Sequence, residues 1–412
     1  MLKQIIENKK AIILLFILAL SLRLTYVFLS PPRPVSYDDT VSWDAVAGNI
    51  ASGNGFLEAN RHPTSTRPPL YPLFLAFIYS VFGYSHLFVK IAHAFLDSIT
   101  VIVVYLTANI LFQKRVAFIT GLCLCFYPPL IVYTGIIGSE TLFVFLLTTV
   151  IYAIIIGVKN ENVFLLISAA IILGIANLCR STLVFYPFFL SAGILLVYNK
   201  KYGFYKLARS LILFMLITIV PVIPWTVRNY YAFGNFLLIN TSSGALFWSG
   251  TYLPWDGKWL DSEAEYFRKI SEIDKVKNPV VSDKLLFNLG LKNIKASPIG
   301  FLKLSVKKFF RFWLQPVGKE LAAKKSVIIG KFISLIHICW LGFALYGFIK
   351  SKEQRLLYMP LTVLFIYFML MHNLISPIAR YRLPIEPFIM IFFAYTAKQI
   401  IFRGKKHEKL QD

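Results

Sequence analysis

Long apolar segments recur along the whole chain, and they constrain its fold more than any other feature. Of the 412 residues, 57% are hydrophobic, and the mean hydropathy of +0.65 is too high for a soluble globular domain. Backbone polar groups cannot stay unpaired in hydrocarbon, so segments of this length must be helical. We therefore predict an all-α polytopic membrane protein with about ten transmembrane helices. The segments are 11–29, 87–112, 116–136, 141–158, 163–178, 183–198, 207–227, 327–349, 356–371 and 383–401.

The basic residues mark one side of the membrane. The chain has 43 Lys and Arg against 20 Asp and Glu, which gives a formal net charge of +23. These residues are spread between the apolar segments rather than gathered on one face, which argues against nucleic acid as a partner. Every second junction is basic, as the positive-inside rule requires. The pattern predicts a multi-pass protein of the plasma membrane with both termini in the cytoplasm.

One apolar segment, residues 70–82, is too short to span, and prolines lie at its start. If this segment crossed the membrane, the basic junctions that follow it would move to the outer side. We therefore predict that it forms a re-entrant or interfacial helix on the outer side.

The polar stretches divide the chain into three parts. The first outer loop, 30–83, contains the pattern of a short helix at 42–51. The second polar stretch, the predicted extracytoplasmic segment at 228–326, contains two helical patterns, 282–294 and 297–313. The second is amphipathic and basic, which is typical of a helix on the membrane surface or of an ordinary helix with a solvated face. The parts are an N-terminal membrane module at 1–227, a small extracytoplasmic segment at 228–326, and C-terminal membrane helices with a basic tail at 327–412.

Carboxylates at the outer membrane boundary are the first candidates for chemistry. Asp38 and Asp39 follow the first apolar segment, and Glu140 opens the fourth. Adjacent carboxylates can act as a general base or bind a divalent cation. Each acid alone also suits a helix cap or the favourable end of a helix dipole. Their combination on one side favours a site in which acids from distant segments meet.

Several arginines are expected on the same outer side, where the positive-inside rule disfavours them. Arginine binds phosphate through bidentate, charge-assisted hydrogen bonds, so the set indicates a phosphate-bearing ligand. Any one of them could instead extend to lipid headgroups or pair with an acid. The candidates are Arg67, Arg180, Arg228, and the pair Arg380 and Arg382 on either side of Tyr381.

In their order along the chain, these motifs resemble the membrane-embedded glycosyltransferases of the GT-C type. The most similar group contains the dolichyl-phosphate-mannose protein mannosyltransferases and the bacterial lipid A aminoarabinose transferases. The family usually has Tyr where Trp43 stands. The motifs are Asp39 four residues before Trp43, with Ala47-Gly48-Asn49-Ile50-Ala51-Ser52-Gly53-Asn54-Gly55-Phe56 following, then Arg67-Pro68-Pro69-Leu70-Tyr71-Pro72, Glu140 at the start of a span, and Arg380-Tyr381-Arg382-Leu383-Pro384 before the last span.

The resemblance implies a GT-C type bundle with outer juxtamembrane helices, and a transferase that uses a polyprenyl-phosphate-linked sugar. Some relatives use a divalent cation such as Mg²⁺ or Mn²⁺ and others do not, so metal dependence stays open. The sugar also stays open, as does the acceptor, which is a glycan, a lipid or a protein. The residues it assigns are Asp39 as the base, Glu140 as the second acid, and Arg67, Arg180, Arg228, Arg380, Tyr381 and Arg382 around the donor.

Two other functions fit parts of the pattern. A transporter or flippase for a lipid-linked saccharide would place charges in the middle of spans, where Asp97 is the main candidate. A polymerase or ligase of surface polysaccharide is an enzyme of a neighbouring kind. The chain has neither a P-loop nor a Gly-x-Ser-x-Gly nucleophile motif. Since most other candidates lie at the outer ends of spans, we favour the transferase.

Overall fold

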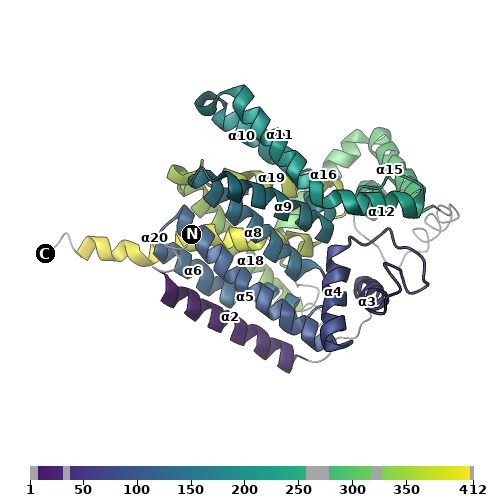
Figure 1. The fold of residues 1–412 in the computed structure, drawn as a ribbon. Helices are drawn as coiled ribbons and strands as arrows, with labels where there is room; N and C mark the ends of the chain where they lie inside the picture. Colours follow the sequence, from purple (N-terminus) through teal and green to yellow (C-terminus); the bar gives the residue numbers. More distant parts are fainter. Residues whose placement is uncertain (1–7, 31–37, 257–277, 318–326, 409–412) are drawn as a thin grey trace.

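The computed structural model describes residues 8–30, 38–256, 278–317 and 327–408, which form a bundle of α-helices (Figure 1). These residues contain no β-strand, and an isolated bridge joins Leu57 and Pro63. The predicted all-α fold is confirmed. The N-terminal helices are α2 (Lys9–Leu29), α3 (Asp38–Ala51), α4 (Leu70–Phe82), α5 (His86–Leu111), α6 (Lys114–Cys125), α7 (Pro128–Thr134), α8 (Glu140–Lys159), α9 (Val163–Cys179), the 3₁₀ turn η1 (Ser181–Leu183) and α10 (Tyr186–Tyr202).

The second half of the chain is also helical. The predicted segment 207–227 ends in α12, which continues to Phe233, so Arg228 lies inside a helix. The elements are α11 (Phe204–Ile219), η2 (Val220–Val222), α12 (Ile223–Phe233), α13 (Ser243–Thr251), η3 (Leu253–Trp255), α15 (Pro279–Ala296), α16 (Pro298–Leu314), α18 (Val327–Lys350), η4 (Lys352–Gln354), α19 (Met359–Leu374), η5 (Ala379–Ile385) and α20 (Glu386–Glu408).

The number of membrane spans depends on how short and bent helices are counted. Among the described residues, seven helical segments are long and apolar enough to cross a bilayer, and the bent pair α6 and α7 makes an eighth. The two other predicted spans are the apolar helices α9 and α19, which have 17 and 16 residues. All ten predicted segments are therefore helical, although helix length alone supports fewer full spans. The chain is a multi-pass membrane protein.

The predicted span at 116–136 is broken rather than continuous. Helix α6 ends at Cys125, α7 begins at Pro128, and the two are bent by 51°. Pro128 and Pro129 lack a backbone N–H and disfavour helical conformation in the preceding residue, so the helix cannot continue through them. The break turns the chain toward the loop that leads into α8.

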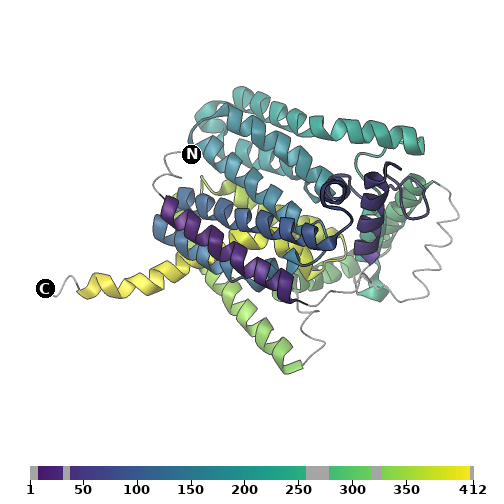
Figure 2. The same ribbon diagram turned by 60° about the horizontal axis from the view of Figure 1, so that its bottom comes forward.

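Two ends of the bundle carry different parts of the chain. The start of α2 and the end of α20 lie at one end, and α3, α4 and α15 lie at the other, in both views (Figures 1 and 2). Helix α4 has the predicted bounds of 70–82 and lies across the end of the bundle rather than along it (Figure 1). This arrangement suits an interfacial helix, because α4 is too short to span.

Helix α8 lies at the centre of the bundle and packs against α5 and α9 (Figure 1). Its apolar residues surround the whole helix rather than forming one stripe, and 83% of its apolar stretch is buried. The first residue of this central helix is Glu140, so the bundle holds the position of that carboxylate.

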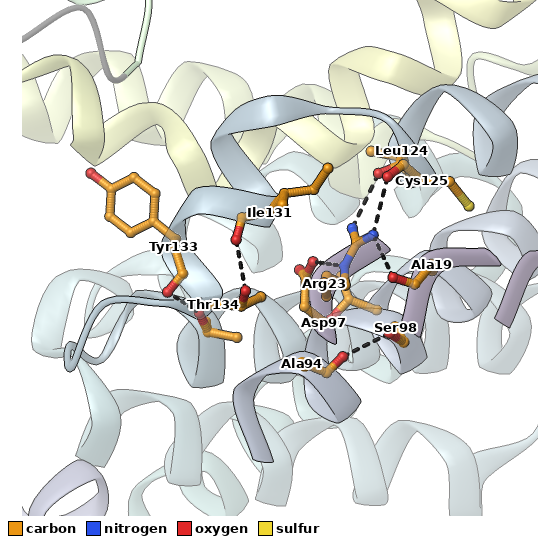
Figure 3. A network of polar contacts seen from close by, with 12 residues as sticks. Ala19, Arg23, Ala94, Asp97, Ser98, Leu124, Cys125, Ile131, Tyr133 and Thr134 are labelled. Atoms are coloured by element: carbon orange, nitrogen blue, oxygen red, sulfur yellow. Dashed lines mark hydrogen bonds and ion pairs between the residues drawn. The ribbon is translucent and has the colours of Figure 1, made fainter. Parts of the chain in front are cut away.

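A buried ion pair joins α2, α5 and α6 (Figure 3). Arg23 and Asp97 are 0% and 1% exposed, and Arg23 Nε donates to Asp97 Oδ2. Arg23 also donates to the carbonyls of Leu124 at 3.1 Å and Cys125 at 3.2 Å, at the end of α6. The charge of Asp97 is therefore neutralised inside the protein, and the contact gives no support to a transporter that uses this acid.

Replacing Arg23 by Met should lower the free energy of unfolding by about 3–5 kcal/mol, because Asp97 would remain buried without its cation. The double variant Arg23→Met with Asp97→Leu should recover a large part of that loss, since no buried charge remains. Thermal unfolding of the purified protein in detergent, analysed as a double-mutant cycle, measures both values. Strictly additive losses would show that the two side chains do not act as a pair.

Candidate functional site

The first turn of α3 lies against the loop that leads into α8. The hydroxyl of the buried Thr40 donates to the carbonyl of Ile137 at 3.1 Å. Asp38 and Asp39 belong to this same first turn, and their side chains lie outside the described part of the structure. The backbone therefore places the turn that contains the predicted base, Asp39, against the loop that precedes Glu140. About a hundred residues separate the two along the chain.

Glu140 and Arg180 form an ion pair at this end of the bundle. Glu140 is 8% exposed, and its Oε1 lies 2.8 Å from Nη1 of Arg180, which follows the end of α9. Arg180 Nη1 also lies 3.2 Å from the hydroxyl oxygen of Ser139, to which it donates. Burial lowers the pKa of Arg180, but the nearby Glu140 carboxylate outweighs that effect and raises it. Arg180 therefore stays charged.

Arg380 approaches the same pair from η5. Its guanidinium charge acts on both Glu140 and Arg180, and it lies 5.7 Å from the centre of the Tyr381 ring. Two guanidinium groups thus face one buried carboxylate. Planar guanidinium groups match the geometry of phosphate and bind it through charge-assisted hydrogen bonds.

Aromatic contacts connect α3 to this cluster. Arg67 donates to the hydroxyl of Ser42 at 2.9 Å and lies 4.8 Å from the centre of the Trp43 ring. Trp43 packs edge-on against Tyr71, with ring centres 5.3 Å apart. Burial and the nearby Glu140 carboxylate raise the pKa of Tyr71, so its hydroxyl stays neutral. Arg67 therefore helps to orient α3 beside Glu140.

Arg382 is not placed to bind a ligand, although the sequence predicts it as a phosphate ligand. It is 0% exposed, and its guanidinium group makes five hydrogen bonds, which equals the number of its N–H donors. The site prediction is therefore corrected in favour of a structural contact. The acceptors are Glu386 Oε1 at 3.0 Å, the carbonyls of Phe312, Trp313 at 2.9 Å and Gln315 at 2.8 Å, and His337 Nε2 at 3.0 Å.

Arg228 also contacts protein groups away from Glu140. It donates to the carbonyls of Phe56 and Thr64, both at 3.2 Å, and lies 4.7 Å from the centre of the Trp225 ring. These contacts fasten the first outer loop to α12. The structure therefore separates Arg228 and Arg382 from the cluster of Glu140, Arg180 and Arg380.

The third carboxylate of the first outer loop, Asp44, is a structural anchor. It accepts hydrogen bonds from the hydroxyls of Tyr79, at 2.5 Å, and Tyr84, and lies 3.1 Å from Nε2 of His86. Burial raises the pKa of Asp44, but these hydrogen bonds outweigh burial and hold it below its ordinary value of 3.8. The contacts fix α3 against α4 and the start of α5.

The sequence analysis did not single out His93, which lies beside Tyr71. Its ring is fully buried, stacks on Tyr71 and Phe74, and has Nε2 at 3.4 Å from the Tyr71 hydroxyl. A lone histidine on an apolar helix gives no pattern that distinguishes it from a core residue. Tyr71 belongs to the motif Arg67-Pro68-Pro69-Leu70-Tyr71-Pro72, but nothing in that motif indicates that Tyr71 contacts Trp43 and His93.

The side chains that the structure describes around Glu140 do not form a metal site. Among the described residues, no group of three His, Cys, Asp or Glu side chains could hold a metal ion. Glu140 already faces two guanidinium groups, whose charge opposes a divalent cation at the same carboxylate. We therefore assign no step of the reaction to a metal.

The chain was compared with known families and proteins. Residues 66–225 match the family described as dolichyl-phosphate-mannose-protein mannosyltransferase. This region includes Arg67, Glu140 and Arg180, whereas Asp39 and Arg380 lie outside it. No curated protein matches the chain by sequence.

Solved structures resemble the whole fold. The archaeal oligosaccharyltransferase AglB from Archaeoglobus fulgidus, in complex with an inhibitory peptide and a dolichol-phosphate, has a TM-score of 0.58 and 13% identity over 98% of this chain and 52% of that one. Its apo form has a TM-score of 0.56 and 12% identity, over 97% and 52%. ArnT from Cupriavidus metallidurans bound to undecaprenyl phosphate has a TM-score of 0.45 and 14% identity, over 93% and 77%.

The likeness to AglB confirms the GT-C type fold that was expected from the sequence motifs. Identities of this size are informative about fold rather than about substrate. The chain spans about half the length of the archaeal oligosaccharyltransferase structures that it resembles.

The anchoring role of Asp44 makes stability depend on pH. Because its pKa is lower in the folded protein, the stabilisation is present above 3.8 and is lost as the pH falls below that value. At neutral pH, Asp44→Asn should cost about 1–3 kcal/mol, since a charged acceptor is lost. Unfolding temperatures from neutral pH to below 3.8 should fall more for the wild type than for the variant; parallel curves would contradict the assignment.

Proposed function

Because the chain has a GT-C type fold, we propose that it is a glycosyltransferase that moves a sugar from a polyprenyl-phosphate-linked donor to an acceptor. The observation that supports this most is the cluster of Glu140, Arg180 and Arg380 beside the first turn of α3. We further propose, from the positive-inside pattern, that both termini are cytoplasmic and that the site is extracytoplasmic.

The cluster suits the phosphate of a lipid-linked donor. A polyprenyl chain stays in the bilayer, so its phosphate lies at the membrane boundary, where the ends of the helices also lie. Arg180 and Arg380 would bind this phosphate through charge-assisted hydrogen bonds, and Glu140 would hold Arg180 in place. The dolichol-phosphate bound in the AglB structure is consistent with this class of donor.

Asp39 is the proposed general base. Its carboxylate would take the proton of the acceptor hydroxyl as the hydroxyl oxygen attacks the anomeric carbon. The bond between that carbon and the phosphate oxygen breaks, and its electron pair stays on the phosphate. The arginines stabilise the charge that develops there, and polyprenyl phosphate leaves. A direct displacement of this kind inverts the anomeric configuration.

Replacing Asp39 by Asn should lower turnover by about 100- to 10,000-fold, because the amide cannot accept the proton of the acceptor. The variant should bind the donor and unfold like the wild type. Release of free polyprenyl phosphate from a panel of polyprenyl-phosphate sugars, followed with purified protein, measures turnover. Normal turnover by a folded Asp39→Asn protein would remove Asp39 from the mechanism. Asp38→Asn in the same assay tests the adjacent candidate acid, and a smaller loss of turnover there supports Asp39 as the base.

Replacing Arg380 by Met should weaken the binding of polyprenyl phosphate by about 10- to 100-fold, because a charge-assisted contact is lost. The exposed Arg209 on α11 gives a matched control, and Arg209→Met should leave the affinity unchanged. Binding of a labelled polyprenyl phosphate to the protein in nanodiscs measures both. Equal affinity of the Arg380 and Arg209 variants would contradict the proposed donor site.

A further inference from the structure

A fully buried lysine joins the extracytoplasmic helix α16 to the segment that carries Arg380. Nζ of Lys308 donates to the carbonyl of Gly250 at 2.8 Å and to that of Ile375 at 3.4 Å. Gly250 lies in the last turn of α13, and Ile375 caps the end of α19. The ammonium group therefore lies at two helix C-termini, where carbonyls lack partners and positive charge is favourable.

Arg382 makes a second connection in the opposite direction. Its guanidinium group donates to the carbonyls of Phe312, Trp313 and Gln315 at the C-terminal end of α16. A cation of α16 thus caps α19, and a cation of η5 caps α16. Residues 375–382, which include Arg380, are fastened at both ends to the same helix.

Other contacts hold the region between these two connections. The ring of His372 has its centre 5.4 Å from those of Phe312 on α16 and Tyr381 on η5. A Cβ atom added at Gly250 would lie 2.4 Å from the carbonyl carbon of Ile375, so α13 touches this backbone directly. The two extracytoplasmic helices therefore constrain the path of the chain toward Arg380.

The buried ammonium group of Lys308 both satisfies these carbonyls and holds their two segments together. Burial lowers the pKa of Lys308 to about 7, and the charge of Arg311 adds to the effect. An apolar side chain of similar volume would leave the carbonyls of Gly250 and Ile375 without this donor, which lowers stability. Nor can such a side chain bind the two carbonyls together.

We infer that Lys308 is a positioning residue for Arg380, which it places by fixing the end of α19 against α13. This inference rests on the proposed function, because it takes Arg380 to be a ligand of the donor phosphate. It follows that α13 and α16, in the part of the chain outside the bundle, set the geometry of the donor site.

Lys308→Met tests the inference, and Lys307→Met is the matched control. Lys307 is the neighbouring lysine of α16, with a side chain that is 65% exposed and lies 3.1 Å from Asp256. In Lys308→Met, the affinity for polyprenyl phosphate should fall at least about tenfold, and KM for the donor should rise while kcat changes little. The control should match the wild type in both measurements.

Hydrogen exchange gives a measurement that needs no substrate. Amides of residues 376–385 should exchange faster in Lys308→Met than in the wild type and the Lys307→Met control. Gly250→Ala provides a second variant that leaves every charge in place, and its Cβ would displace the Ile375 backbone. It should produce the same faster exchange and the same loss of affinity, so a failure of Lys308→Met to fold would leave the test intact.

The outcomes separate this inference from the proposed function. Unchanged exchange at 376–385 in both folded variants overturns the positioning role, whatever the protein binds. Faster exchange with unchanged donor affinity overturns the link to the donor site. If the wild type binds no polyprenyl phosphate at all, the proposed function fails and the link to the donor site fails with it, while the exchange data still decide whether Lys308 places this segment.

Discussion

A carboxylate buried at the end of a helical bundle needs positive charge beside it, and the arrangement around Glu140 follows from that need. Glu140 is the first residue of the most central helix, so it cannot move to water. Arg180 at the end of α9 pairs with it, and Arg380 approaches from η5. The pair therefore fixes where two distant segments meet, and the second guanidinium group brings a third segment to the same carboxylate.

Cations at helix C-termini recur throughout the structure. Arg23 caps the broken end of α6, Lys308 caps α13 and α19, and Arg382 caps α16. Each donates to carbonyl groups at the end of a helix, where intrahelical donors run out and positive charge is favourable. Arg23, Arg180 and Arg382 each pair with a carboxylate, and their other hydrogen-bond partners distinguish them. Arg23 and Arg382 donate mainly to backbone carbonyls, whereas the hydrogen bonds described for Arg180 go to the side chains of Glu140 and Ser139.

Elements with a strong local pattern were predicted well. Helix α4 has the bounds that its apolar run and prolines indicate, and α16 begins at Pro298, one residue after the start of the predicted pattern at 297. The break between α6 and α7 was not predicted, although both prolines are visible in the sequence. Apolar composition continued across the prolines, and it outweighed the backbone signal. The polar stretch 261–277 lies outside the described residues.

By itself, the sequence determined the class of fold and the approximate positions of most of its helices. Apolar runs, prolines and caps act within a few residues, so they can be recognised without knowing the contacts. Only the tertiary structure decided which arginine meets Glu140, which caps a helix, and that Arg23 neutralises Asp97. A guanidinium group has the same chemistry in each case, and its role depends on which distant segment packs against it; for Arg382, the carbonyl of Phe312 is 70 residues away.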